Sequence, residues 1–325
     1  MKRLITVVAV LAAAYAGYWY VGAQAVEAGA RAALTEARAN RWGDAGAVTL
    51  AGFPSRFDLT FDGPRLQSPD GSIAWAAPVA QLFALSYRPN AIIAWLPPEQ
   101  ELQLDGQSYQ IRNEDMRASA RFGLATDLPL AEATAVIEAP EIAASGLGPL
   151  GKARQLRAAL AEASPLEDLP NAPTYRIGLE ALDVDSLLLG APIPRVTLDA
   201  IAALRAPLDR ASLEAGEMPR PQQVDLRGLH LDWGGKRLDV TGMVTLDRAG
   251  NPDGTLELRT QDWQAWLSEA IARGLIPAKQ QILIGSVAQG LAQQSADGAL
   301  VLPLSFRGGK TYLGPLALGP APRFW

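Results

Sequence analysis

Apolar and polar positions alternate with a period of two through much of residues 46–145. The clearest run is 56–62, in which Phe57, Leu59 and Phe61 alternate with charged or hydroxyl side chains. Successive side chains of a strand point to opposite faces of its sheet, so this pattern predicts strands with one buried face. Gly52 and Pro54 predict the corner that precedes this run. Short apolar runs punctuated by Pro, Gly or Asn then continue to residue 145, as in an antiparallel meander.

A second series of strand patterns begins at residue 174. Runs that fit strands lie at 174–189, 224–234, 236–247, 254–260, 299–306 and 310–318, and the run 195–208 fits either a strand or a helix. Two segments between these strands have helical spacing instead. The first, at 262–274, places Trp263, Trp266, Leu267, Ala270 and Ile271 on one stripe, and the second, at 277–295, aligns Leu283, Val287 and Leu291.

The composition changes between the two series of strands. Residues 149–164 are rich in Ala, Leu, Arg and Glu, which predicts a helix, and three prolines follow before residue 174. We therefore expect an α+β, β-dominated fold of antiparallel curved sheets, with two β-rich lobes, a few covering helices and one N-terminal transmembrane helix. The expected parts are an anchor at 1–23, a juxtamembrane helix at 24–43, a first lobe at 44–148, a helix and Pro-rich linker at 149–173, and a second lobe at 174–325 with helices at 262–274 and 277–295.

The N-terminus predicts the location of the protein. Residues 4–23 carry no charge, and about 20 apolar residues at ~1.5 Å per residue span the ~30 Å hydrocarbon core of a bilayer. Lys2 and Arg3 precede the run, and positive residues stay on the cytoplasmic side. Tyr15, Tyr18, Trp19 and Tyr20 gather at its other end, where aromatic rings favour the interface. These features predict a single-pass inner-membrane protein, held through residues 4–23, with its body in the periplasm.

A cleaved signal peptide is the alternative interpretation of this segment. Ala23-Gln24-Ala25 has the small-x-small form that a signal peptidase accepts, so cleavage near Ala25 would release the body into the periplasm. We favour a retained anchor because the apolar run exceeds the ~7–15 residues of a usual signal core.

Composition narrows the function. The net charge is −5 and no basic stripe is evident, which argues against nucleic-acid binding. The absence of cysteine excludes disulfides, thiolate metal sites and cysteine nucleophiles, and it suits an oxidising compartment. With one histidine, His230, a zinc site of several histidines cannot be built. We expect no cofactor and no metal.

Three motifs suggest a chemical role, but a structural role explains each of them more simply. His230 and Asp232 share a strand face and could pair, but the expected state is a solvent-facing strand residue. Residues 146–151, GLGPLG, match the dinucleotide-binding spacing, yet no buried strand precedes them and no βαβ unit follows. Acidic residues at 183, 185, 247 and 253 lack the spacing of a calcium loop. No catalytic motif is present, so we expect a protein that is not an enzyme.

Large apolar residues on strands and one helix define the candidate binding region. Core packing explains each of them, and an apolar groove for acyl chains is the alternative, because both put an apolar face inward. The candidate groove residues are Trp75, Phe83, Ile93, Trp95, Trp233, Trp263 and Trp266.

Several segments resemble a known family. The Gly-Phe-Pro-x-Arg corner at 52–56, AIIAWLPPEQ at 91–100, the stretch 231–258 and GPLALGPAP at 314–322 are similar to a family of uncharacterised, single-anchor envelope proteins of Gram-negative bacteria. More distantly, the succession of strands resembles AsmA-like envelope proteins. That resemblance implies curved sheets with an apolar inner face and a role in lipid movement or envelope homeostasis.

The sequence leaves three functions open. The first is lipid handling or envelope homeostasis through an apolar sheet face, with a lipid ligand. The second is a periplasmic scaffold or assembly factor that holds an envelope protein partner. The third is a hydrolase that uses a pair of carboxylates, which spacing alone does not reveal.

Overall fold

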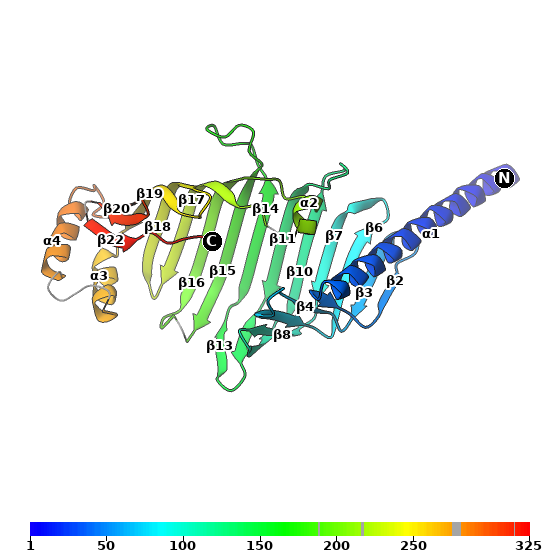
Figure 1. The fold of residues 1–325 in the computed structure, drawn as a ribbon, viewed down its shortest axis with the longest axis horizontal. Coiled ribbons are helices and arrows are strands. Elements are labelled where there is room, and N and C mark those ends of the chain that lie inside the picture. The colour runs from blue at the N-terminus through cyan, green and yellow to red at the C-terminus, as the bar shows by residue number, and fades with distance from the viewer. Residues whose placement is uncertain (188, 216–217, 275–280, 315) are drawn as a thin grey trace. The chain divides into compact units, whose positions relative to one another are not determined.

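The computed structural model describes residues 1–187, 189–215, 218–274, 281–314 and 316–325. The fold is dominated by β-strands that form a large antiparallel sheet, with few helices and a long apolar N-terminal helix (Figure 1), as the sequence predicts. The chain divides into two compact units. Unit 1 comprises Met1–Leu124 and Ala133–Gln155, and unit 2 comprises Ala125–Glu132 and Leu156–Trp325.

Helix α1 (Lys2–Ala39) is continuous over 38 residues. The predicted anchor at 1–23 and juxtamembrane helix at 24–43 are therefore one helix, because the Ala-, Glu- and Arg-rich second half favours continuation of the first. In the part of the chain that the structure describes, α1 is the helix long and apolar enough to cross a membrane. A signal anchor and a signal sequence both have these properties.

The strands of unit 1 form two antiparallel arrays. They are β1 (Gly43–Asp44), β2 (Val48–Ala51), β3 (Arg56–Asp62), β4 (Arg65–Gln67), β5 (Ile73–Ala76), β6 (Val79–Leu85), β7 (Arg88–Leu96), β8 (Glu99–Leu104), β9 (Gln107–Arg112), β10 (Asp115–Phe122), β12 (Glu141–Ala144) and β13 (Gly148–Lys152). One array pairs in the order β2-β3-β6-β7-β10. The other pairs in the order β1-β4-β5-β8-β9-β12-β13. Strand β11 (Leu130–Glu138) falls across the division between the units.

The chain passes between the two arrays of unit 1 at short corners. A proline lies at each of these corners: Pro64 between β3 and β4, Pro78 between β5 and β6, and Pro98 between β7 and β8. The backbone N–H groups of Gly63, Ala77 and Asn113 donate across the corners to the carbonyls of Pro78, Pro64 and Pro98. Proline donates no ladder hydrogen bond, so it is tolerated where one array ends and the next begins.

The period of two in 56–62 is confirmed as a strand with one buried face. Phe57 and Leu59 are buried and lie opposite Ala84 and Leu82 of β6. The predicted corner is also present: Gly52 has φ 105°, the Phe53–Pro54 peptide bond is cis, and β2 returns antiparallel to β3. A positive φ is a conformation that glycine adopts without steric cost.

Unit 2 is built on eight consecutive strands, each antiparallel to the next. They are β15 (Thr174–Ser186), β16 (Ile193–Leu204), β17 (Pro221–Trp233), β18 (Lys236–Leu246), β19 (Pro252–Thr260), β20 (Leu300–Arg307), β21 (Lys310–Leu313) and β22 (Leu316–Pro320). The ambiguous run 195–208 is thus a strand in its first ten residues. Within the described residues, the helices that interrupt the series are α2 (Arg210–Ala215), α3 (Trp263–Ala272) and α4 (Gln281–Ala292).

The predicted helix at 149–164 is wrong. Residues of this segment form β13 and β14 (Gln155–Glu162) instead. Leu156, Ala158 and Leu160 are half-buried and alternate with the exposed Arg157 and Ala159. The N–H of Ala163 donates to the carbonyl of Thr174, which links the end of β14 to the start of β15. Strand pairing has therefore overridden the helix propensity of Ala, Leu and Glu, since propensity is a weak prior.

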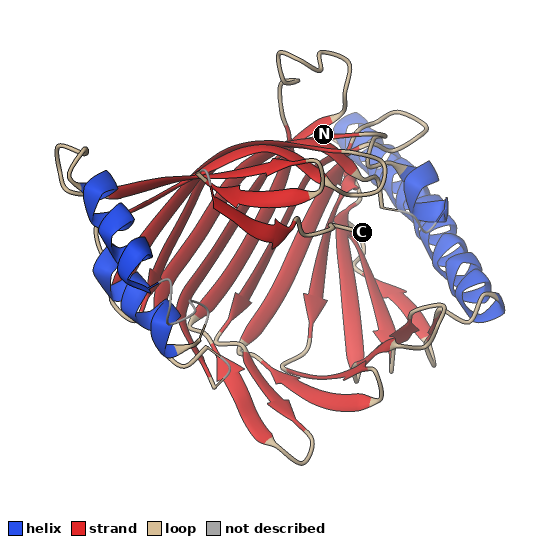
Figure 2. Cartoon of the chain, turned by 60° about the vertical axis from the view of Figure 1, so that its left-hand side comes forward, coloured by secondary structure: helices blue, strands red, loops and turns tan. Residues whose placement is uncertain are grey.

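The two helices predicted after β19 are present as α3 and α4 (Figure 2, blue), and the predicted start of the second lies outside the described residues. The packed face of α4 includes Leu291 of the predicted stripe but not Val287. Ala288 and Ala292 are buried against Leu300 of β20, whereas Val287 is 53 % exposed. Small alanines let the helix approach the strand closely, so the inward face is turned by one residue from the one that the larger side chains suggested. The side chain of Leu283 lies outside the described residues.

Candidate functional site

An unbroken row of aliphatic side chains crosses unit 2. Cross-strand pairing joins residues on six consecutive strands, and directly opposed residues share a face of the sheet. The row is Leu179, Leu198, Leu229, Val240, Leu258 and Leu302, from β15 to β20. Five inter-strand steps of ~4.8 Å make it roughly 24 Å long. We call this set the aliphatic row.

The same face carries a second apolar row, and the opposite face is polar. The second row contains Ile177, Ala200, Leu226, Gly242, Leu256 and Leu304. On the other face, one residue along each strand, the corresponding row contains Glu180, Thr197, His230, Asp239 and Arg259, and it ends on Val301 of β20. The sheet of unit 2 is therefore amphipathic, with one face suited to water and the other to an apolar covering.

The middle of the apolar face of unit 2 is incompletely covered. Leu179 is 47 % exposed, and Leu198, Leu229 and Leu258 are half-buried, while Val240 is 6 % exposed. The two margins of the face have partners within unit 2. Tyr175, Ala202 and Leu204 form one buried cluster with Leu208, and Leu300 packs with α4 in another. What remains is an aliphatic surface between two packed margins.

The candidate groove residues of unit 1 on β6 and β7 lie on a face of mixed character. Phe83 is directly opposite Ile93, and Trp95 is opposite Gln81. Asp58 pairs with Phe83 and Arg117 with Trp95, so these aromatic rings share their face with charged residues. The more uniformly apolar face of the same strands holds residues such as Leu59, Leu82 and Ala94. An acyl groove at Phe83, Ile93 and Trp95 stays a prediction.

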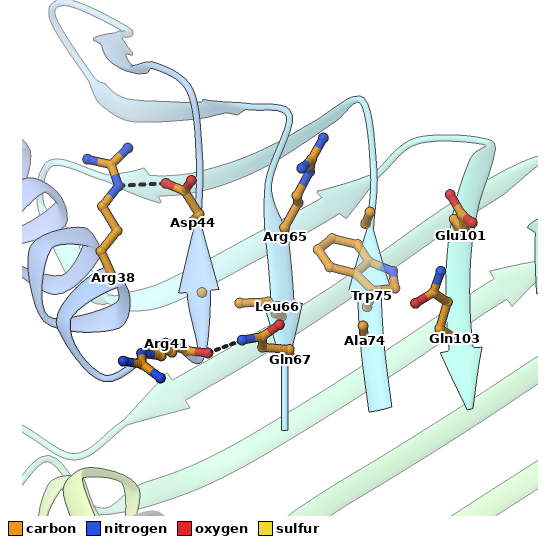
Figure 3. A pocket seen from close by; sticks show the side chains of 12 residues that line it. Arg38, Arg41, Asp44, Arg65, Leu66, Gln67, Ala74, Trp75, Glu101 and Gln103 are labelled. Atoms are coloured by element: carbon orange, nitrogen blue, oxygen red, sulfur yellow. Dashed lines mark hydrogen bonds and ion pairs between the residues drawn. The ribbon is translucent and has the colours of Figure 1, made fainter. Parts of the chain in front are cut away.

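The fourth candidate of unit 1, Trp75, lines a groove on β1, β4, β5 and β8 beside the end of α1 (Figure 3). The groove has a volume of about 620 Å³ and is lined by Arg38, Asp44, Arg65 and Glu101 as well as Trp75. Trp75 donates its indole N–H to Oε1 of the buried Gln100, 2.9 Å away. The surroundings of Trp75 are thus polar and charged, which suits a polar ligand better than an acyl chain.

The carboxylates of this groove are already engaged. Asp44 accepts from Nε of Arg38 at 2.5 Å, and this hydrogen bond lowers the pKa of the Asp44 carboxyl. Glu101 accepts from the hydroxyl of Ser108 at 2.8 Å. A carboxyl that is held ionised by an arginine is a poor proton donor at neutral pH, so the geometry does not favour Asp44 as a general acid.

The three candidates of unit 2 belong to two packed clusters. The ring centroids of Trp233, at the end of β17, and Trp266 of α3 are 5.4 Å apart. Lys236 Nζ lies 4.7 Å from the Trp233 ring centroid. Arg273 approaches the same ring at 4.7 Å. Trp263, on α3, packs instead beside the buried residues of α4 and β20. Cations over indole rings are a stable arrangement. These contacts favour a role for Trp233 and Trp266 in packing α3 against the end of β17.

The remaining candidate motifs have structural roles. The exposed His230 pairs through Nδ1 with Asp239 of β18, its cross-strand neighbour, rather than with Asp232. Strand β13 begins at Gly148, within the glycine motif, where a dinucleotide site requires a helix. Asp247 accepts from the side chain and backbone of Asn251, which lower its pKa and close a turn. Among the described residues, no group of three or more His, Asp or Glu is placed to hold a metal ion.

Helix α1 makes specific contacts with unit 1 in the second half of its apolar run. Tyr18 Oη donates to the carbonyl of Ser86 at 2.7 Å, and Trp19 Nε1 donates to the carbonyl of Arg56 at 2.8 Å. The Trp19 ring stacks on Phe57 with a centroid distance of 5.9 Å. The sequence predicted the aromatic residues of α1 but not these partners, because partners 37 and 68 residues away leave no periodic signal.

The fold and these surfaces define a class of β-dominated protein with a large antiparallel sheet and a long apolar N-terminal helix. Residues 19–322 match the family described as "Uncharacterized protein conserved in bacteria (DUF2125)". The chain belongs to this family, and the resemblance to an uncharacterised bacterial family is confirmed over most of its length. No curated protein and no solved structure gives a significant match.

Proposed function

We propose that this protein is a retained, single-pass inner-membrane protein whose periplasmic body binds lipid acyl chains on the apolar face of unit 2. The observation that carries the proposal is the aliphatic row, which continues over six strands without a polar side chain and of which Val240 is the one fully buried member. The role is binding rather than catalysis. It agrees with the Gram-negative envelope setting and the AsmA-like architecture that the sequence resemblance implies.

The contacts of α1 support a retained anchor over a cleaved signal peptide. Cleavage near Ala25 would remove Trp19 and Gly22 from the ring of Phe57, which is 4 % exposed in the intact chain. It would also remove the tyrosine hydroxyls that bond the buried Ser86. A signal peptide that is removed on export does not contribute to the core of the folded protein. Lys2 and Arg3 then favour a cytoplasmic N-terminus and a periplasmic body.

The chemistry of the face suits an acyl chain. Burial of each methylene contributes ~0.8 kcal/mol, so ten methylenes against the aliphatic row gain on the order of 8 kcal/mol before the cost of ordering the chain. The row offers no hydrogen-bond donor or acceptor from its side chains, so it would recognise the ligand by shape and apolar area. The polar row on the opposite face keeps that side of the sheet in water.

Photo-crosslinking of the full-length chain tests the proposal. The protein is reconstituted into phosphatidylethanolamine–phosphatidylglycerol vesicles that contain a phospholipid with a diazirine on its acyl chain. Crosslinked peptides are then mapped by mass spectrometry. Because α1 will react in any membrane, only peptides within residues 174–307 count. We expect crosslinks on β15–β20 at residues of the two apolar rows.

Two adjacent residues provide a matched pair of variants. Leu198 and Thr197 are neighbours on β16 that point to opposite faces. Leu198→Lys should reduce the crosslinks on β15–β20 several-fold, whereas Thr197→Lys should leave them unchanged, with circular dichroism confirming that both variants fold. Absence of lipid label from residues 174–307 in the parent chain would overturn the proposal and favour a protein partner on this face.

A further inference from the structure

We infer that the ends of the strands around Phe53 and Tyr87 insert into the outer leaflet of the same membrane that α1 crosses. Together with the helix they form an aromatic collar, which we define as Tyr15, Tyr18, Trp19, Tyr20, Phe53 and Tyr87. The inference rests on the retained anchor of the proposed function, but it concerns a different surface from the aliphatic row. The body would then be fixed to the bilayer at a set depth, not suspended on a tether.

The loops before β3 and between β6 and β7 are bonded to the helix and to each other. Besides the bonds from Tyr18 and Trp19 described above, Tyr15 Oη lies 3.1 Å from Oγ of Ser86. The N–H of Ser86 donates to the carbonyl of Ser55 at 2.9 Å, which ties one loop to the other. Phe53 meets Trp19 edge to face with a centroid distance of 5.2 Å. These contacts fix the position of both loops along the helix.

The length of the helix places these contacts within the outer leaflet. At ~1.5 Å per residue, Tyr15 is about 20 Å and Trp19 about 26 Å from Lys2 along the helix axis. With Lys2 and Arg3 at the cytoplasmic headgroups, a hydrocarbon core of ~30 Å ends near Gly22. Figure 1 shows the N-terminal part of α1 running clear beyond the ends of β3 and β6, so this part is free to enter the bilayer. The loops that bond to Tyr15–Trp19 must then reach the outer leaflet.

The exposed side chains of the loops suit that position. Phe53 is 60 % exposed and Tyr87 is 63 % exposed, beside Tyr18 at 52 % and Tyr20 at 61 %. Aromatic rings favour the interface between headgroups and acyl chains. The exposed Arg88 follows Tyr87 and is able to extend its guanidinium toward lipid phosphates.

The polar groups of the loops are compatible with little water. Trp19 donates to the carbonyl of Arg56, and Tyr18 donates to the carbonyl of Ser86. The hydroxyl of Ser86 donates to the carbonyl of Ser55. Ser86 is fully buried. Backbone groups without partners are costly in a low-dielectric region. Here Trp19 and Tyr18 of the helix supply the partners of two of these carbonyls, and Ser86 supplies the partner of the third. The exposed surface of the collar is consequently aromatic.

Depth-dependent fluorescence quenching tests the inference, and the absence of cysteine from the chain makes single labels straightforward. The full-length variants Phe53→Cys, Tyr87→Cys and Arg88→Cys carry an environment-sensitive nitrobenzoxadiazole label. Arg88 serves as a position outside the ring contacts, in case a label at Phe53 disturbs Trp19. Val10→Cys reports on the anchor. Leu147→Cys is the matched control, because Leu147 is also an exposed apolar loop residue of unit 1, at 73 %. It follows the end of β12, which pairs with the first half of β9.

The variants are reconstituted into phosphatidylethanolamine–phosphatidylglycerol vesicles that contain lipids spin-labelled near the headgroup or at the acyl end. We expect labels at 53, 87 and 88 to shift to shorter emission wavelengths and to lose emission with the shallow spin label. The label at 10 should lose emission with the deep one, and the label at 147 with neither. Labels at 53, 87 and 88 that behave like the label at 147, with deep quenching at 10 retained, would overturn the docking and leave the anchor intact. Loss of deep quenching at 10 would overturn the anchor, and the docking with it.

Discussion

A Cβ atom added to Gly22 would lie 2.8 Å from Cζ of Phe57. Helix α1 and strand β3 therefore approach each other as closely as the missing side chain of glycine allows. Phe57 is buried, and its ring is covered on the same side by Trp19. The contact makes the apolar helix a part of the core of unit 1, and it gives the clearest means of separating an integrated anchor from a detachable signal.

Substitution of two helical glycines should change stability in opposite directions. Gly22→Ala should lower the free energy of unfolding by about 1–2 kcal/mol, because the packed ring of Phe57 must shift to admit a methyl group. Gly29→Ala should raise it by about 0.5–1 kcal/mol, because nothing lies within 4 Å and alanine favours a helix. Chemical denaturation in detergent, followed by near-ultraviolet circular dichroism, measures both. Equal stabilisation by the two changes would contradict the packing of α1 on β3.

Truncation should distinguish the N-terminal part of α1 from the part that completes unit 1. A chain that starts at residue 25 leaves Phe57 uncovered, and exposure of such a side chain costs about 1.5–3 kcal/mol. A chain that lacks only residues 2–12 retains the contacts of Tyr15, Tyr18 and Trp19 and should unfold at the same denaturant concentration as the full chain in detergent. If both truncated chains unfold at the same midpoint as the parent, the helix is a tether and cleavage becomes the better interpretation.

The sequence predicted those features that depend on neighbouring residues. The alternation at 56–62 determines which residues of β3 are buried, and Gly52 with Pro54 determines the corner before it. The length and polarity of the segment at 262–274 likewise sufficed for α3. Each of these patterns is complete within one element, so no distant residue is needed to interpret it.

Features that depend on distant partners were missed or misread. Strand β14 has the composition of a helix, and only its pairing makes it a strand. The packed face of α4 is set by how closely Ala288 and Ala292 approach Leu300, which periodicity cannot foresee. The aliphatic row was invisible for a similar reason: each strand reveals its own apolar face, but the register that aligns six strands comes from the assembled sheet. Lys236 lies over the rings of Trp233 and Trp266, and Arg273 lies over that of Trp233. These cations agree with the packing interpretation of the two tryptophans, and the apolar groove stays a prediction.

The turn between β4 and β5 should show a pH dependence centred on Asp70. Hydrogen bonds from the hydroxyls of Ser68 and Ser72 hold the pKa of the Asp70 carboxyl at about 2, below its ordinary value. Because the folded pKa is depressed, the stabilising contribution of the carboxylate is fully present above the unfolded pKa, about 3.9, and is lost as the pH falls toward 2. A carboxyl-carbon NMR titration should give a midpoint near 2 for Asp70.

The control for this titration removes the hydroxyl donors. Ser68→Ala should move the Asp70 midpoint toward its ordinary value, and Ser68→Ala with Ser72→Ala should move it further. Asp70→Asn should abolish the contribution of this turn to the pH dependence of stability below pH ~4. A midpoint for Asp70 that is the same with and without the two serines would show that the turn does not hold the carboxylate.

Gly242 is a position where β18 and β19 leave no room for a Cβ atom, and Gly254 on β19 is another. Gly242 belongs to the second apolar row, its φ is 135°, and a Cβ there would lie 2.4 Å from the carbonyl oxygen of Thr255. Gly242→Ala should therefore lower the free energy of unfolding by about 3 kcal/mol or more, since backbone cannot yield as a flexible side chain does. Gly178→Ala, on β15 of the same unit, is the matched control: its nearest contact would be Ala159 Cβ at 4.0 Å, so the change should stay within about 0.5 kcal/mol. Urea denaturation of the two variants compares them directly. A small effect at Gly242 would mean that β18 and β19 separate readily, and the continuous apolar face that the proposed lipid site requires would then lack a rigid base.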